Sequence, residues 1–132
     1  MATTIRPFLM FQGDAEAAMD FYVSLFPDAR VDDIMRYGPG QPGPEGSVMK
    51  ASFTLGDQSF ICIDSPVQHA FGFTPALSLF VTCASEDQLD QLYAALSEGG
   101  GVLMPLSNYG FSRKFGWVND RFGVSWQLNL PA

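Results

Sequence analysis

Residues 14–25, DAEAAMDFYVSL, and residues 85–96, SEDQLDQLYAAL, follow one pattern and decide the fold. Each stretch begins with a residue that favours a helix N-cap, Asp14 or Ser85, and continues with apolar residues at helical spacing. A shift of 71 residues (85 − 14) lays the first stretch on the second. The coinciding apolar positions are Ala18 with Leu89, Phe21 with Leu92, Tyr22 with Tyr93, and Leu25 with Leu96. In the second stretch Ser85 and Gln88 also have the spacing of a capping box.

The segments around these two helices read as strands in the same order. Runs rich in β-branched and aromatic residues, separated by glycine and proline, predict strands at 5–11, 29–37, 47–55, 59–64, 77–82, 102–106, 114–120 and 123–130. The pattern therefore predicts an internal duplication of a strand-helix-three-strand unit. We expect an α+β fold in which two βαβββ modules form one cup-shaped mixed sheet. Residues 1–132 would make one domain, with modules at 1–66 and 76–132 joined by a loop at 67–75.

Composition excludes several classes of protein. The chain has 132 residues, 47% of them hydrophobic and 16% charged, as in a packed globular domain. A net charge of −7 with seven basic residues disfavours nucleic acid and anionic membranes as partners. No apolar run approaches the length of a membrane span, and the first residues lack the pattern of a secretory signal. Cys62 and Cys83 lie in apolar runs, which favours free thiols and a cytoplasmic location.

Residues 120–128, DRFGVSWQL, raise the question of a binding site. After a turn, Val124, Trp126 and Leu128 alternate with Ser125 and Gln127. One face of this strand belongs to the core. A sheet with helices on only one side leaves its other face open, so we expect Gln127 to point into a cleft formed by the open faces.

Three longer motifs resemble one protein family over almost the whole chain. They are PFLMFQGDAEAAMDFYVSLFPDARV from Pro7, RYGPGQPGPEGSVMKASFTLGDQSF from Arg36, and FGWVNDRFGVSWQL from Phe115. Together they resemble the PhnB-like branch of the vicinal oxygen chelate superfamily, which includes glyoxalases, bleomycin-resistance proteins and extradiol dioxygenases. Members of this branch are often labelled 3-demethylubiquinone-9 3-methyltransferase. The resemblance implies paired βαβββ modules and a homodimer.

The resemblance also implies where a metal would be bound. Enzymes of the superfamily hold a divalent ion with His and Glu on the first and last strands of each module. Spacing from the helix motif carries the first-strand position onto Pro7, and the shift of 71 residues gives its partner Ser78. Counting from the DRFG turn carries the last-strand position onto Gln127, and the equivalent in SFICID is Cys62. None of these residues is a histidine or a carboxylate, so we expect no metal and no cofactor. We interpret all four as lining the cleft.

Cys62 and His69 each have a catalytic and a structural interpretation. Cys62 would share the cleft and act as a nucleophile only with a lowered pKa, yet its neighbours in SFICID are apolar or acidic, which favours a buried structural thiol. His69 is the one histidine of the sequence, and its place in the loop SPVQHAFGF favours a structural role over that of a ligand or base.

Aromatic residues concentrate in two loops, HAFGF between the modules and SNYGFSRKFGW in the second module. Tyr109, Phe111 and Arg113, in SNYGFSRKFGW, have the chemistry to close over a planar or anionic ligand. Aromatic loops also bury themselves in a second subunit, and both interpretations stay open.

The sequence therefore predicts a small-molecule-binding protein whose ligand is apolar or aromatic. An enzyme of the same fold, with or without a metal, is the alternative, and whether the chain catalyses a reaction is left open. Ubiquinone methylation is disfavoured, because no glycine-rich strand-to-helix turn for a nucleotide cofactor is present. The segment GPGQPGPEG lacks the lysine of a phosphate loop as well.

Overall fold

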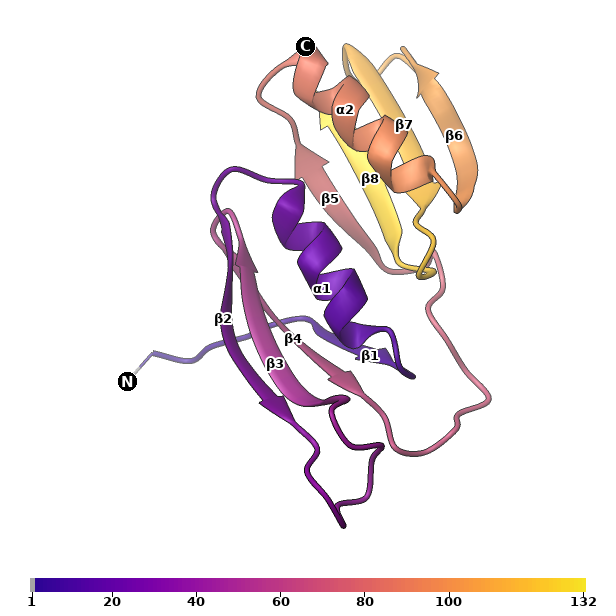
Figure 1. Cartoon of the computed structure of the whole chain (residues 1–132). Coiled ribbons are helices and arrows are strands. Elements are labelled where there is room, and N and C mark those ends of the chain that lie inside the picture. Colours follow the sequence, from indigo (N-terminus) through magenta and orange to yellow (C-terminus); the bar gives the residue numbers. More distant parts are fainter. Residues whose placement is uncertain (1) are drawn as a thin grey trace. The chain divides into compact units, whose positions relative to one another are not determined.

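The computed structural model describes residues 2–132 and divides into two compact units, one ending at His69 and the other running from Ala70 to Ala132. Each unit has the order strand, helix and three strands that the repeat predicts (Figure 1). The first unit contains β1 (Phe8–Phe11), α1 (Ala15–Ser24), β2 (Ala29–Arg36), β3 (Val48–Leu55) and β4 (Gln58–Asp64). The second contains β5 (Ser78–Thr82), α2 (Glu86–Ser97), β6 (Gly101–Ser107), β7 (Lys114–Asn119) and β8 (Ser125–Leu130).

Each unit builds its own four-stranded mixed sheet. The strand orders are β1-β4-β3-β2 and β5-β8-β7-β6, and the first pair of each sheet is parallel while the other pairs are antiparallel. The helix of each unit lies across one face of its sheet (Figure 1), α1 against β2, β3 and β4, and α2 against β6, β7 and β8. The predicted α+β class is confirmed. Neither helix is long and apolar enough to cross a membrane, as far as residues 2–132 show.

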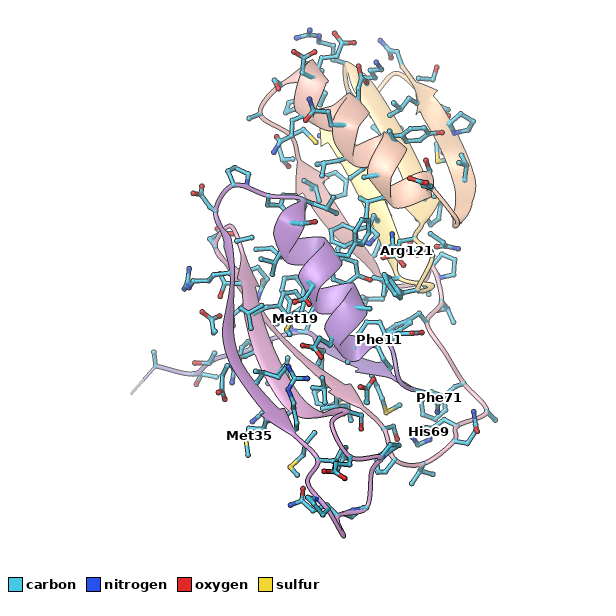
Figure 2. All side chains as sticks on the ribbon, viewed as in Figure 1. Phe11, Met19, Met35, His69, Phe71 and Arg121 are labelled. Carbon is cyan, nitrogen blue, oxygen red and sulfur yellow. The ribbon has the colours of Figure 1, made fainter. Side chains whose placement is uncertain are left out.

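The core of the first unit lies between α1 and its sheet. Ala18, Met19 and Tyr22 are the buried positions on the middle of the helix, and Figure 2 shows Met19 and Phe11 between α1 and the strands. The Tyr22 ring lies 6.3 Å from that of Phe53, which identifies the face of β3 that the helix covers. The predicted helical face is thus shifted slightly toward Met19, and Phe21 remains half-buried.

The first turn of α2 is capped as the sequence predicts. Ser85 Oγ accepts a hydrogen bond from the Gln88 backbone N–H at 3.1 Å. The Gln88 side chain closes the capping box one residue earlier than the standard pattern, since its Oε1 accepts from the Ala84 N–H at 2.7 Å.

The first turn of α1 is capped from a distant strand. Asp14 stands at the N-cap but its side chain makes no cap hydrogen bond. Asp64, at the end of β4, instead accepts from the Gly13 and Ala15 N–H groups at 2.8 and 2.9 Å and from the Val48 N–H at 3.1 Å. The sequence pattern could not show this, because the cap comes from the other end of the unit.

Close packing of α2 requires a glycine in β7. A Cβ atom added at Gly116 would lie 2.8 Å from Leu106 Cδ2 and 3.1 Å from Tyr93 Cδ2. Tyr93 belongs to α2, so Gly116 lies on the face of the sheet that the helix covers. Its register partner Leu128 is fully buried on the same face.

The turn before β8 is organised by one buried carboxylate. Asp120, 3% exposed, accepts from the Phe122 and Val124 N–H groups through Oδ1 at 2.8 and 3.1 Å. Its Oδ2 accepts from the Trp126 indole N–H at 2.9 Å. These contacts fix both the turn and the first residues of the strand, so they determine which side chains of β8 lie on each face.

We predict that Asp120→Asn lowers the free energy of unfolding by about 2–4 kcal/mol, because an amide NH₂ would face buried donors that a carboxylate accepts. Denaturant unfolding followed by circular dichroism measures this change. Asp57→Asn, in the exposed turn between β3 and β4, is the matched control and should change stability by less than about 0.5 kcal/mol. Equal effects of the two substitutions would contradict the role given to Asp120.

Candidate functional site

The face of the second sheet away from α2 is where Gln127 lies. In β8, Trp126 and Leu128 are buried beneath the helix, and Gln127 between them points to the other face and is half-buried. The alternation predicted for this strand is therefore confirmed. Ser78 and Phe80 of the neighbouring strand share the face, because their register partners are Ser125 and Gln127. We call this surface the open face of the second unit.

An aromatic cluster covers part of the open face. Phe115, the register partner of Asn129, is almost completely buried by the three other rings. Its ring lies 5.0 Å from Phe111, 6.2 Å from Tyr109 and 6.4 Å from Phe80. Phe80 and Phe111 nevertheless remain 58% and 63% exposed. The 108–113 loop thus folds two of its aromatic residues onto the sheet and leaves apolar surface uncovered.

Polar groups lie beside these rings. The Gln127 side chain makes no hydrogen bond to any other side chain or backbone group of residues 2–132. Ser78 Oγ lies 2.8 Å from Ser125 Oγ, and Trp117 Nε1 donates to Ser125 Oγ at 2.8 Å. Ser78 and Gln127 were predicted from the sequence but Phe80 was not, because Leu77, Leu79, Phe80 and Val81 are all apolar and do not reveal which of them faces outward.

The structure places Cys62 on the other kind of surface. It is fully buried between Phe60 and Asp64 of β4, on the face that α1 covers. The open-face residues of β4 are Ser59, Ile61 and Ile63. The prediction that Cys62 lines the cleft is therefore wrong. The position equivalent to Gln127 was placed one residue off in β4, and a slip of one residue moves a side chain to the other face of a sheet. The interpretation of Cys62 as a buried structural thiol fits this position.

Pro7 directly precedes β1, and its carbonyl accepts a hydrogen bond from the Ile61 N–H at 2.9 Å. The open-face positions of β1 itself are Phe8 and Met10, whose register partners are Ile61 and Ile63. The open-face positions of β1 are therefore apolar, while Ser59 of β4 and Ser52 and Thr54 of β3 add hydroxyl groups to the same face.

Arg113 is turned toward α2. Its guanidinium lies 3.8 Å from Glu86 Oε1, and the Lys114 ammonium contacts Glu86 and Asp90 of the same helix. Arg113 and Phe111 also line one hollow of about 420 Å³, so the expectation that Arg113 closes over a ligand together with Tyr109 and Phe111 stays a prediction. The acidic first turn of α2 attracts both cations, a contact between segments 28 residues apart that spacing alone does not predict.

His69 is bonded locally in the segment after β4 (Figure 2). Its Nε2 lies 2.9 Å from Ser65 Oγ, which also accepts from the Val67 N–H. A small hollow of about 220 Å³ lies beside Ser65, and the polar side chains that line it are bonded to one another or to backbone. These local bonds are typical of a structural loop.

The residues at the superfamily's metal positions do not fit a divalent ion. Pro7, Ser78 and Gln127 offer at best a hydroxyl and an amide oxygen, and Cys62 lies on the opposite face of its sheet. Burial, with the nearby Asp64 charge, raises the Cys62 pKa to about 12, so the thiol is protonated. Residues 2–132 contain no group of three or more His, Cys, Asp or Glu placed to hold a metal.

A nucleotide-type cofactor does not fit the helix N-termini either. Such sites present unbonded backbone N–H groups to the anionic part of the cofactor. At α1 the Gly13 and Ala15 N–H groups are bonded to Asp64, and at α2 the Gln88 N–H is bonded to Ser85. No step of a reaction can therefore be assigned to either group.

Comparison with known proteins places this geometry in a family. The family model described as 3-demethylubiquinone-9 3-methyltransferase matches residues 3–129. A Bacillus cereus structure, a PhnB protein provisionally named 3-demethylubiquinone-9 3-methyltransferase, is 54% identical, with a TM-score of 0.94 over 97% of this chain and 99% of its own. Protein PA1353 from Pseudomonas aeruginosa is 28% identical, with a TM-score of 0.85 over 98% of both chains.

A more distant structure shares the fold alone. It is a glyoxylase/bleomycin resistance protein/dioxygenase domain from Frankia, 16% identical, with a TM-score of 0.64 over 100% of this chain and 93% of its own. No curated protein matches the chain.

We predict that neither cysteine of the native protein reacts with Ellman's reagent at pH 8, because burial raises the pKa of both thiols and hides their sulfur atoms. Both should react within minutes once guanidinium unfolds the chain. A rapid reaction of one thiol in the native state, lost in Cys62→Ala but kept in Cys83→Ala, would show that Cys62 is an accessible nucleophile.

Proposed function

Because the chain belongs to the family described as 3-demethylubiquinone-9 3-methyltransferase, within the glyoxalase and bleomycin-resistance superfamily, we propose that it is a small-molecule-binding protein of that superfamily. Its ligand is a small apolar or aromatic compound held on the open face of the second unit. One observation carries the proposal: exposed aromatic rings, with Phe80 directly beside the unbonded Gln127 amide, lie on a sheet face that no helix of its unit covers.

The aromatic rings supply the main attraction. Phe80, Phe111 and Tyr109 offer flat apolar surface on which a planar ligand can stack. Covering about 200 Å² of such surface contributes roughly 5 kcal/mol, which corresponds to a dissociation constant between millimolar and micromolar. Tighter binding therefore requires polar contacts as well.

Gln127 is placed to make such a contact. Its amide both donates and accepts hydrogen bonds, and its register partner Phe80 is beside it on the open face. A ligand that stacks on Phe80 would shield this amide from water. A ligand without a hydrogen-bonding group leaves the amide unsatisfied, which weakens binding, whereas a ligand with such a group restores the hydrogen bond. The amide thus favours an aromatic compound with a polar substituent.

The proposal includes the state and location of the protein. We propose a homodimer, because the resemblance to the superfamily implies one and because Phe8, 55% exposed on the first unit, offers apolar surface for an interface apart from the aromatic cluster. We propose a cytoplasmic location, because both cysteines are free and buried.

We predict that Phe80→Ala weakens the binding of 8-anilinonaphthalene-1-sulfonate, an aromatic fluorescent probe, at least fivefold in a fluorescence titration. Gln127→Leu should change the affinity while the free energy of unfolding stays within about 0.5 kcal/mol. Met35→Ala, at a similarly exposed apolar residue of β2 (Figure 2), is the control and should leave binding unchanged.

Three results would contradict this assignment. If Phe80→Ala and Met35→Ala bind the probe with equal affinity, the probe does not bind on the open face. Unfolding of Gln127→Leu would make Gln127 a structural residue. A dimer that dissociates in Phe80→Ala during sedimentation, with unchanged probe binding, would place the aromatic cluster at the subunit interface.

Two measurements separate the alternatives. We predict no heat of binding for S-adenosylmethionine in calorimetry, because the helix N-termini are already bonded to side chains of the chain itself. We also predict less than stoichiometric nickel, zinc, iron and manganese in the purified protein, because the donor set is poor. Saturable binding of S-adenosylmethionine would favour methyl transfer, and a stoichiometric metal would favour an enzyme of the glyoxalase or dioxygenase type.

A further inference from the structure

Three side chains on the open face of the second unit are linked in a row by hydrogen bonds. Trp117 Nε1 lies 2.8 Å from Ser125 Oγ, and Ser125 Oγ lies 2.8 Å from Ser78 Oγ. Ser125 is 1% exposed and thus sealed within the sheet, whereas Ser78 is half-buried at its surface. These hydrogen bonds connect the half-buried indole of Trp117, through the buried hydroxyl of Ser125, to the hydroxyl of Ser78, which a ligand can reach.

The indole sets the direction of these hydrogen bonds. An indole N–H only donates, so Ser125 Oγ accepts from Trp117. The single hydroxyl proton of Ser125 is buried, and leaving it without an acceptor would cost about 1–3 kcal/mol. Ser78 Oγ is the acceptor within reach, and it therefore receives the Ser125 proton.

Ser78 is left with a proton that has a poor partner inside the protein. The nearest acceptor is the Pro75 carbonyl at 3.4 Å, which is longer than the usual range for a hydroxyl donor. A ligand oxygen at a normal distance would be a better acceptor. The Ser78 hydroxyl proton is thus prepared to donate to a ligand oxygen, because its partner inside the protein is distant and the Ser125 proton keeps the Ser78 hydroxyl from donating back to Ser125.

We propose that Ser78 determines ligand specificity, selecting aromatic compounds that carry a carbonyl oxygen over those with a hydrocarbon group at that position. This inference rests on the proposed function and adds the polarity of the contact. Ser78 and Phe80 are two residues apart on one face of β5, so about 7 Å separates their Cα atoms. A ring stacked on Phe80 with a carbonyl substituent spans that distance.

Gln127 does not provide the same selection. Its amide offers both a donor and an acceptor, so it can match either kind of substituent by rotating. At Ser78, Trp117 and Ser125 keep the hydroxyl proton available for a ligand acceptor.

Two naphthalenes that differ only at the selected atom test the inference. 2-Acetylnaphthalene carries a carbonyl where 2-ethylnaphthalene carries a methylene, and their affinities are measured by displacement of 8-anilinonaphthalene-1-sulfonate. One net hydrogen bond predicts that the wild-type protein binds the ketone about three- to tenfold more tightly. In Ser78→Ala the two affinities should become equal, while that for 2-ethylnaphthalene changes less than twofold.

Thr82→Ala is the matched control. Thr82 lies on the same strand and the same face, so this variant also deletes one exposed hydroxyl but should keep the preference for the ketone. Trp117→Phe should weaken the preference, because Ser125 can then accept from Ser78. The ratio of the two affinities is the readout, since a merely structural role of Ser78 would change both affinities alike.

The outcomes distinguish the two levels of the proposal. Equal wild-type affinities for the two compounds, or a preference that survives in Ser78→Ala, would overturn the role of Ser78 and leave the proposed binding function standing. If neither naphthalene displaces the probe from the wild-type protein, the proposed function fails and this inference fails with it.

Discussion

The bonds of Asp120 to the turn before β8 are the constraint on which the rest of the second unit depends. The carboxylate holds two backbone N–H groups and the Trp126 indole, so it determines where the strand starts and which way Trp126 points. Alternation then places Ser125 and Gln127 on the open face and Leu128 under α2. A slip of one residue would exchange these sets, burying an amide under the helix and exposing the largest core side chain.

The two units share their order of elements and yet differ in chemistry. The open face of the first unit carries the apolar residues Phe8, Met10, Ile61 and Ile63 on β1 and β4, and its polar groups there are limited to the Ser59 hydroxyl. In the second unit the corresponding strands carry hydroxyl and amide groups, and the 108–113 loop adds aromatic rings above them. The two units therefore share one scaffold. The open face of the second unit combines apolar surface with directed hydrogen bonds. This combination is what a selective site for small molecules requires.

Much of the fold could be predicted from the sequence, because helical spacing, capping residues and alternation are local signals. The two helices, the order of the strands and the face of Gln127 all follow from them. Contacts between segments that are distant in the sequence could not be predicted from these local signals. Asp64 replaces Asp14 as the cap of α1, the register of β4 buries Cys62, and Glu86 attracts Arg113. At the site, Ser78 and Gln127 were identified by spacing, whereas Phe80 and the bonds of Ser125 required the paired register of β5 and β8.

The central claim is that an aromatic ligand rests on the open face of the second unit, and mapping of backbone amide shifts by NMR tests it most directly. With saturating 8-anilinonaphthalene-1-sulfonate, the largest shifts should fall on residues 78–82, 108–113 and 125–130. The amides of α2, on the other face of the same sheet, should move least. Shifts confined to α2 or to the first unit would contradict the account.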